Sequence, residues 1–288
     1  MKNLRSLLFM PGNNPGMLVS ADNLDADLII YDLEDAVSLD EKDAARILVK
    51  NALINVPFNN SFVTVRINPI DSPYWRDDLE AILPARPDGI VIPKASVESV
   101  QVIEQFVEKF NSDHGIDDDL RFLMLVETAA GIIEVDKIAA ASDRIDALLL
   151  GGEDYSVSMG VKRTKSSKEL EYARFRLATV AKAFGLDAID TPYTDIDDME
   201  GMIEDTKFVK SIGFNGRLII NPRQIPHIHE IFNPTKEELQ EALAILDAAK
   251  EAEEKGLGVF SFKGKMVDKP VITRASNLVN SAKDWGVI

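Results

Sequence analysis

The sequence contains no cysteine, and this one absence removes several classes of protein. Without thiols the chain forms no disulfides, carries no thiolate nucleophile and builds no zinc site that depends on cysteine ligands. Long apolar runs are missing too, because no stretch approaches the roughly 20 residues that a membrane-spanning helix requires. The first residues also lack a signal-peptide pattern, and we therefore expect a cytoplasmic protein with no membrane partner.

Positive charge is the second scarcity. The chain has 32 lysines and arginines against 48 aspartates and glutamates, which gives a formal net charge of −16. Nucleic acids bind to basic surfaces that replace phosphate counterions, so this balance disfavours a nucleic-acid partner. An anionic substrate would be repelled by the same field, and its site would need a local cation, either an arginine or a bound metal ion.

Eight short apolar runs organise most of the chain. They begin near Leu4, Asp27, Phe62, Asp88, Arg121, Ile145, Asp187 and Gly216. The stretches between them are long enough for the crossover helices that parallel strands need, and helical spacing of apolar residues predicts helices over 38–56, 97–110 and 168–184. Eight strand–helix repeats favour an α/β fold, a (β/α)8 TIM barrel formed by residues 1–232. A doubly wound open sheet is the alternative.

The pattern changes after Pro234. Residues 235–255 form a long helical pattern rich in alanine, glutamate and leucine, and a last helix extends to about Ala282. The segment 256–270 between them has no regular pattern. Residues 233–288 are too few to build a second large core, so we expect a C-terminal helical arm that carries a lid loop.

Two acidic residues stand where neighbouring apolar runs end. Glu127 follows the fifth run and Asp154 follows the sixth. The carboxyl ends of barrel strands carry the loops that build the active site, so we expect the two carboxylates to meet there. Mg²⁺ binds few protein carboxylates and keeps several waters, which makes Glu127 and Asp154 candidate metal ligands. The alternative is that both are solvent-facing loop acids.

Arg66 ends the third run and offers a planar fork that fits a substrate carboxylate. Its alternative role is an ion pair with Glu34 or Asp35, and the two roles are compatible because a buried arginine needs acidic support. Glu34 and Asp35 follow the second run and are candidates for orienting metal-bound waters. For Asp32 and Asp35, direct metal binding and helix capping stay open as alternatives.

Three other polar residues receive simpler interpretations. Lys94 ends the fourth run, where a desolvated lysine can form a Schiff base with a carbonyl substrate. A salt bridge from Lys94 to Glu127 or Glu34 is the interpretation that we favour. His227 and His229 lie two residues apart, which places them on different sides of a helix, and we expect both at the surface.

Seven segments of the chain together resemble the bacterial citrate lyase β subunits, in the citrate lyase and malyl-CoA lyase barrel family. They are RSLLFMPGNNPG at residues 5–16, DLEDAVSLDEKDAAR at 32–46, VRIN at 65–68, ETAAG at 127–131, EDY at 153–155, INPRQ at 220–224 and GKMVDKP at 264–270. The segments cover essentially the whole chain in the expected order. Relatives often carry a lysine near position 19, whereas this chain has Val19 followed by Ser20, Ala21 and Asp22.

The resemblance implies a carbon–carbon lyase that cleaves a 3-hydroxyacyl thioester by a retro-Claisen reaction. The expected substrate is citryl-acyl carrier protein or the CoA thioester of citrate, and the products are oxaloacetate and an acetyl thioester. The resemblance assigns Mg²⁺ to Glu127 and Asp154, and substrate contacts to Arg66 and Glu127. It makes Asp268 an acid/base in the site of a neighbouring subunit, within a homotrimer or larger assembly that can include other citrate lyase subunits.

Two alternatives to this function stay open. Lyases of malyl-CoA or citramalyl-CoA use the same chemistry, and only the shape of the pocket separates them from a citryl lyase. A non-catalytic scaffold subunit of a lyase complex is the alternative from another class. The intact set of Arg66, Glu127, Asp154 and Asp268 disfavours a scaffold, because a scaffold has no physical need for those residues.

Overall fold

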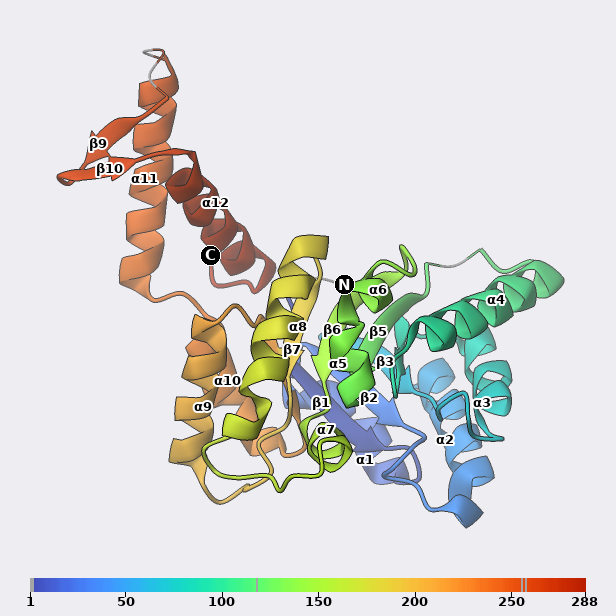
Figure 1. Cartoon of the computed structure of the whole chain (residues 1–288). Coiled ribbons are helices and arrows are strands. Elements are labelled where there is room, and N and C mark those ends of the chain that lie inside the picture. The colour runs from blue at the N-terminus through green and yellow to red at the C-terminus, as the bar shows by residue number, and fades with distance from the viewer. Residues whose placement is uncertain (1–2, 118, 255, 257) are drawn as a thin grey trace. The chain divides into compact units, whose positions relative to one another are not determined.

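The chain forms two compact units, Met1–His229 and Glu230–Ile288. The computed structural model in Figure 1 describes residues 3–117, 119–254, 256 and 258–288. No helix among these residues combines the length and the apolar character needed to cross a membrane.

The first unit is a closed barrel of eight parallel strands, with each strand paired to the next in the sequence. The strands are β1 (Ser6–Pro11), β2 (Leu28–Asp32), β3 (Phe62–Arg66), β4 (Gly89–Ile92), β5 (Arg121–Val126), β6 (Ile145–Leu150), β7 (Asp187–Asp190) and β8 (Gly216–Ile219). All eight apolar runs form the strands that they predict. Strand β8 also pairs with β1, so the sheet closes and the open-sheet alternative is wrong.

Helices connect the strands or, in the case of α10, follow the last one, and they form the outer layer of the barrel (Figure 1). They are α1 (Pro15–Ser20), α2 (Lys42–Asn55), α3 (Trp75–Ile82), α4 (Val97–His114), α5 (Ala129–Ile133), α6 (Val135–Ala139), α7 (Gly152–Ser158), α8 (Glu171–Phe184), α9 (Met199–Ser211) and α10 (Ile225–Phe232). The helices predicted over 38–56, 97–110 and 168–184 correspond to α2, α4 and α8. Helix α4 runs four residues further than predicted, to His114, and is capped by Gly115, whose φ of 62° suits glycine.

Side chains fill the inside of the barrel, which is therefore a core and not a channel. The buried cluster draws on seven of the eight strands and consists of Leu4, Leu7, Leu28, Ile30, Val91, Leu123, Leu125, Ala147, Leu149, Ile189 and Leu218. Burying one such leucine contributes about 2 kcal/mol. Phe9 packs on this cluster at its edge and is only partly buried. A solid core leaves the strand ends as the place for a site.

The second unit consists of α11 (Lys236–Glu254), a hairpin of β9 (Phe260–Phe262) and β10 (Lys265–Val267), and α12 (Lys269–Asp284). The two helices share a core of Leu239, Ala242, Ala275, Val279 and Ala282. The hairpin occupies the segment for which a lid loop was predicted. Its turn residues Lys263 and Gly264 both have positive φ, 47° and 75°, which is the geometry of a two-residue hairpin turn. Lys255, the end of the predicted long helix, lies outside the described residues.

Candidate active site

A cavity of about 360 Å³ opens at the carboxyl ends of the barrel strands. It is lined by Phe9, Asp32, Asp35, Ala36, Arg66, Leu125, Glu127, Gly151, Gly152, Glu153, Asp154, Thr191, Pro192, Leu218 and Ile220. These residues come from seven of the eight strands, all except β4, and from the segments that follow them. The cavity thus brings together four predicted site residues, Arg66, Glu127, Asp154 and Asp35.

Arg66 is held in place by the acids that follow β2. Its Nε and Nη2 donate to the two carboxylate oxygens of Asp32 at 2.7 and 2.5 Å, and its Nη1 lies 3.0 Å from Glu34 Oε2. The Phe9 ring lies 4.8 Å from the guanidinium carbon. Asp32 therefore occupies one edge of the predicted fork, and a substrate carboxylate would approach the edge formed by Nη1 and Nη2, where Nη1 already contacts Glu34 and Asp35.

Asp32 anchors the loop as well as the arginine. It is 1% exposed, and its carboxylate accepts the backbone N–H groups of Glu34 and Ala36 at 2.8 and 3.0 Å. These contacts hold the loop after β2 and combine with the ion pair to Arg66, but they do not cap a helix, because the next helical turn begins only at Leu39. Asp35 is different, because its side chain is 67% exposed and lies 3.4 Å from Arg66 Nη1.

Glu34 is a buried carboxyl group in the same cluster. Burial raises its pKa to about 8, although the charge of Arg66 acts in the opposite direction. Its Oε2 accepts no hydrogen bond from the described residues, despite its short distance to Arg66. A carboxyl group whose pKa is raised toward neutrality is suited to proton transfer.

Glu127 is 3% exposed and receives a hydrogen bond of 2.7 Å from the backbone N–H of Lys94. Burial raises its pKa to about 7, the Lys94 N–H lowers it, and the nearby charge of Asp154 raises it again. Lys94 adopts a φ of 46°, a strained value that turns its N–H toward Glu127. The predicted salt bridge from Lys94 to Glu127 or Glu34 is wrong, because the side chain lies 3.7 Å from Asp71 and is half exposed.

Asp154 lies in the first turn of α7 and is exposed. Glu127 and Asp154 are two carboxylates that follow neighbouring strands, and among the described residues no three or more acids or histidines are arranged so that together they could hold a metal ion. Their oxygens suit Mg²⁺, which takes most of its ligands from water and substrate. Five acids, Asp32, Glu34, Asp35, Glu127 and Asp154, surround the single Arg66, so the cavity favours a further cation.

Asp268 belongs to the second unit, where it begins α12. Its side chain accepts the backbone N–H of Val271 at 3.3 Å and is partly exposed. An aspartate directly before Lys269-Pro270 is typical of a helix start, and Asp268 is the N-cap of α12. Asp268 combines a structural role with a carboxylate that solvent reaches.

Sequence reasoning missed two features of the barrel. His229 is not a surface residue, because its Nε2 lies 2.8 Å from Ser6 Oγ and 3.5 Å from Asp27 Oδ1, and its side chain is 19% exposed. Thr191 was also overlooked, although it lines the cavity and accepts the backbone N–H of Gly152 at 2.9 Å. The only signal for Thr191 was its position directly after the apolar run that forms β7.

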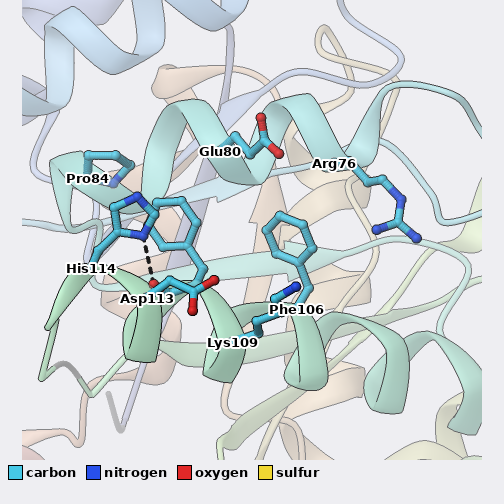
Figure 2. Close-up of a pocket in the computed structure, with 8 residues that line it drawn as sticks. Arg76, Glu80, Pro84, Phe106, Lys109, Asp113 and His114 are labelled. Carbon is cyan, nitrogen blue, oxygen red and sulfur yellow. Dashed lines mark hydrogen bonds between the residues drawn. The ribbon is translucent and has the colours of Figure 1, made fainter.

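A larger hollow of about 480 Å³ lies between α3 and α4 and contains no predicted site residue (Figure 2). Phe106, Phe110 and His114 stack along α4, with the last two ring centres 4.0 Å apart. Arg76 and Glu80 face them from α3. The hollow lies on the outside of the barrel, away from the strand ends, so its size alone does not identify an active site.

Comparison with known proteins gives one consistent result. The model of the HpcH/HpaI aldolase/citrate lyase family matches residues 5–222. Citrate lyase subunit beta of Leuconostoc mesenteroides subsp. cremoris is 39% identical over 96% of this chain and 93% of that protein. Human mitochondrial citramalyl-CoA lyase is 31% identical over 96% of this chain and 85% of that protein. The protein CitE from Mycobacterium tuberculosis, solved with magnesium, acetoacetate and coenzyme A, is 30% identical, has a TM-score of 0.77 and covers 97% of this chain and 98% of its own.

Proposed function

The chain belongs to the HpcH/HpaI aldolase/citrate lyase family, and we propose that it cleaves citryl thioesters to oxaloacetate and an acetyl thioester. It is a carbon–carbon lyase with a closed eight-stranded barrel, as its relatives are. The observation that carries the proposal is the pairing of Glu127 and Asp154 opposite Arg66 in one cavity. Citrate and its thioesters are rich in carboxylates, which this cavity can bind only through cations.

We propose Mg²⁺ as the cofactor, held by Glu127 and Asp154. A related structure contains magnesium, and the oxygen donors of this pair match the preference of that ion. When bound, Mg²⁺ supplies Lewis-acid polarisation of the substrate hydroxyl and a neighbouring carboxylate. The backbone N–H of Lys94 binds one carboxylate oxygen of Glu127 and so restricts rotation of the carboxylate. The second oxygen is then held in one direction.

Arg66 binds a further substrate carboxylate through the edge formed by Nη1 and Nη2, beside Glu34 and Asp35. Asp32 holds the guanidinium with two hydrogen bonds, and therefore the substrate does not have to order a flexible side chain. Each such charged hydrogen bond contributes about 1.5–3 kcal/mol. The same contact neutralises negative charge on the substrate, which the net charge of −16 of the chain would otherwise repel.

The bond changes balance with two proton transfers. The substrate hydroxyl gives its proton to a base, for which we propose Glu34 with Asp35 beside it, because the pKa of Glu34 is raised to about 8. The carbon–carbon bond then breaks, the hydroxyl carbon becomes the ketone of oxaloacetate, and the electron pair moves into the thioester enolate. An acid protonates the enolate carbon and yields the acetyl thioester.

We propose Asp268 as that acid, acting in the site of a neighbouring subunit of a homotrimer or larger assembly. The support is the partly exposed carboxylate beside the hairpin of the second unit, whose Met266 is 70% exposed. In this proposal the barrel, residues 1–232, binds the substrate, and the extension, residues 233–288, of a neighbouring subunit supplies the acid. A mixture of two inactive variants, Glu127→Gln and Asp268→Asn, should regain activity when subunits exchange, whereas exchange without recovery would contradict action in a neighbour.

The thioester carrier is acyl carrier protein or CoA, and other citrate lyase subunits are further candidate partners. A second candidate substrate is citramalyl-CoA, because the human relative with that activity matches 96% of this chain. Incubating the protein with Mg²⁺ and citryl-CoA, citramalyl-CoA or malyl-CoA distinguishes them. We expect oxaloacetate from citryl-CoA and no product in excess EDTA. Turnover of citramalyl-CoA alone, with pyruvate as the product, would replace the citryl assignment.

A further inference from the structure

A cluster of two arginines and two aspartates is buried beside β7 and β8. Arg174 of α8 donates to both oxygens of Asp190 at 3.0 and 2.9 Å, and to both oxygens of Asp205 at 2.9 and 2.8 Å. Arg217 of β8 donates to Asp190 at 2.6 Å and also contacts Asp205. Two positive and two negative charges thus satisfy one another across four elements of the barrel.

The cluster lies outside the cavity. Arg174 and Arg217 are 1% exposed, Asp190 is fully buried, and none of the four residues lines the cavity. Burying charges is costly, and apolar residues in their place often give equal or greater stability. A fully satisfied polar network does, however, hold its members in one arrangement. The cluster can therefore hold neighbouring parts of the barrel in fixed positions.

A chain of hydrogen bonds connects the cluster to the proposed metal ligands. Arg217 Nε donates to the backbone carbonyl of Thr191 at 3.0 Å. The Thr191 hydroxyl oxygen in turn accepts the backbone N–H of Gly152 at 2.9 Å. Gly152 is the first residue of α7, the helix whose first turn carries Asp154.

Close packing makes this chain of contacts rigid. A Cβ atom on Gly152 would lie 2.7 Å from the Thr191 hydroxyl oxygen, and one on Gly151 would lie 2.5 Å from Glu127 Cβ. Real Cβ atoms do not approach other atoms so closely. The two glycines therefore fit between Thr191 on one side and Glu127 on the other, and they set the position of α7 against Glu127.

We propose that Thr191 is a positioning residue for the metal pair. The buried cluster holds the backbone of Thr191 in place, and the Thr191 hydroxyl in turn holds the first residue of α7. This keeps Asp154 at a distance from Glu127 that allows one cation to bind both carboxylates. Outer contacts of this kind typically change metal affinity or activity by about 10–100-fold when they are removed. The inference rests on the proposed function only through the metal pair itself.

The test measures binding of Mn²⁺ alone, by the spin-resonance signal of the free ion, because Mn²⁺ accepts the same oxygen ligands as Mg²⁺. Thr191→Val keeps the shape and removes the hydroxyl, and we expect Mn²⁺ affinity to fall about tenfold. Thr191→Ser keeps the hydroxyl and should stay within about threefold of the wild type. Arg217→Lys, which keeps the charge and loses the Nε contact to Thr191, should fall between the two.

Thr64→Val is the matched control. Thr64 is also fully buried in the barrel and donates to the Ile29 carbonyl at 3.2 Å, far from α7 in the sequence. If Thr191→Val binds Mn²⁺ as the wild type does, or loses no more affinity than Thr64→Val at a comparable melting temperature, the positioning role is wrong. If the wild type itself fails to bind Mn²⁺, the metal site of the proposed function fails instead.

Discussion

The two sides of the cavity differ in whether their acids already have a cation. On the side of β2 and β3, Asp32 and Glu34 lie against Arg66, with hydrogen bonds as short as 2.5 Å. On the side of β5 and β6, Glu127 has one backbone N–H donor and Asp154 is exposed. The first side carries its counter-charge within the chain, whereas the second must obtain it from solution. The difference explains how an acidic protein can hold an anionic substrate.

The largest effect is expected on the side without a cation. Glu127→Gln keeps the volume and the contact to Lys94 N–H, but it removes the charge that binds Mg²⁺. We expect the variant to lose Mg²⁺ binding and more than about 100-fold of kcat/KM, beyond the range for an indirect contact. Titration calorimetry with Mg²⁺ and the oxaloacetate assay measure both, and a folded variant with full activity in EDTA would contradict the metal assignment.

On the side with its own cation, the arginine is expected to matter by geometry and not only by charge. Arg66→Lys keeps one positive charge but cannot bind Asp32 and a substrate carboxylate at the same time. Loss of one charged hydrogen bond, about 1.5–3 kcal/mol, predicts a fall of at least about tenfold in kcat/KM. The exposed Arg76→Lys of α3 is the control, and a change below twofold at Arg66 would place it outside the site.

The pH dependence of metal binding sharpens the same contrast. The pKa of Glu127 is raised to about 7, mainly by burial, and only the ionised form binds a cation. Below pH 7 a proton competes with the metal, so Mg²⁺ affinity should fall by up to about tenfold per pH unit, while above pH 8 it should be constant. Calorimetry between pH 5.5 and 8.5 measures this, and a flat profile would mean that Glu127 is ionised throughout.

The smallest effect concerns stability. Burial raises the pKa of Glu34 from 4.5 to about 8, so ionisation favours the unfolded chain, and folding stability is lost as the pH rises through this window. Glu34→Gln removes this loss and gives up part of the contact with Arg66. We expect a net gain on the order of 1 kcal/mol at pH 8 that shrinks toward pH 5. Denaturant unfolding at both pH values compares the two proteins, and an equal difference at both would argue against a buried carboxyl with a raised pKa.

The sequence was informative wherever one local signal decides the outcome. Apolar runs located all eight strands, because a strand buried on both faces must be apolar along its length. Acids directly after those runs identified Glu127 and Asp154, since the position at a strand end already places them at one rim. The two strands of the hairpin at Phe260–Val267 were not predicted, because each has only three residues.

Contacts between distant elements were beyond the sequence. Asp32 binds one edge of Arg66 although the two residues are 34 positions apart, and from the sequence several other acids were equally good partners for this arginine. The buried pairing of Arg217 with Asp190 spans 27 positions and needs the closed barrel to bring β7 and β8 together. The salt bridge predicted for Lys94 was wrong because its backbone N–H, and not its side chain, contacts Glu127.

That backbone contact also determines how freely position 94 can vary. The donor to Glu127 belongs to the main chain, so almost any side chain at residue 94 preserves it, and only proline removes it. The φ of 46° favours glycine, asparagine and aspartate over branched residues. Selection for activity from a randomised codon at this position should therefore recover glycine most often and exclude proline, with the lysine charge under no constraint from the chemistry.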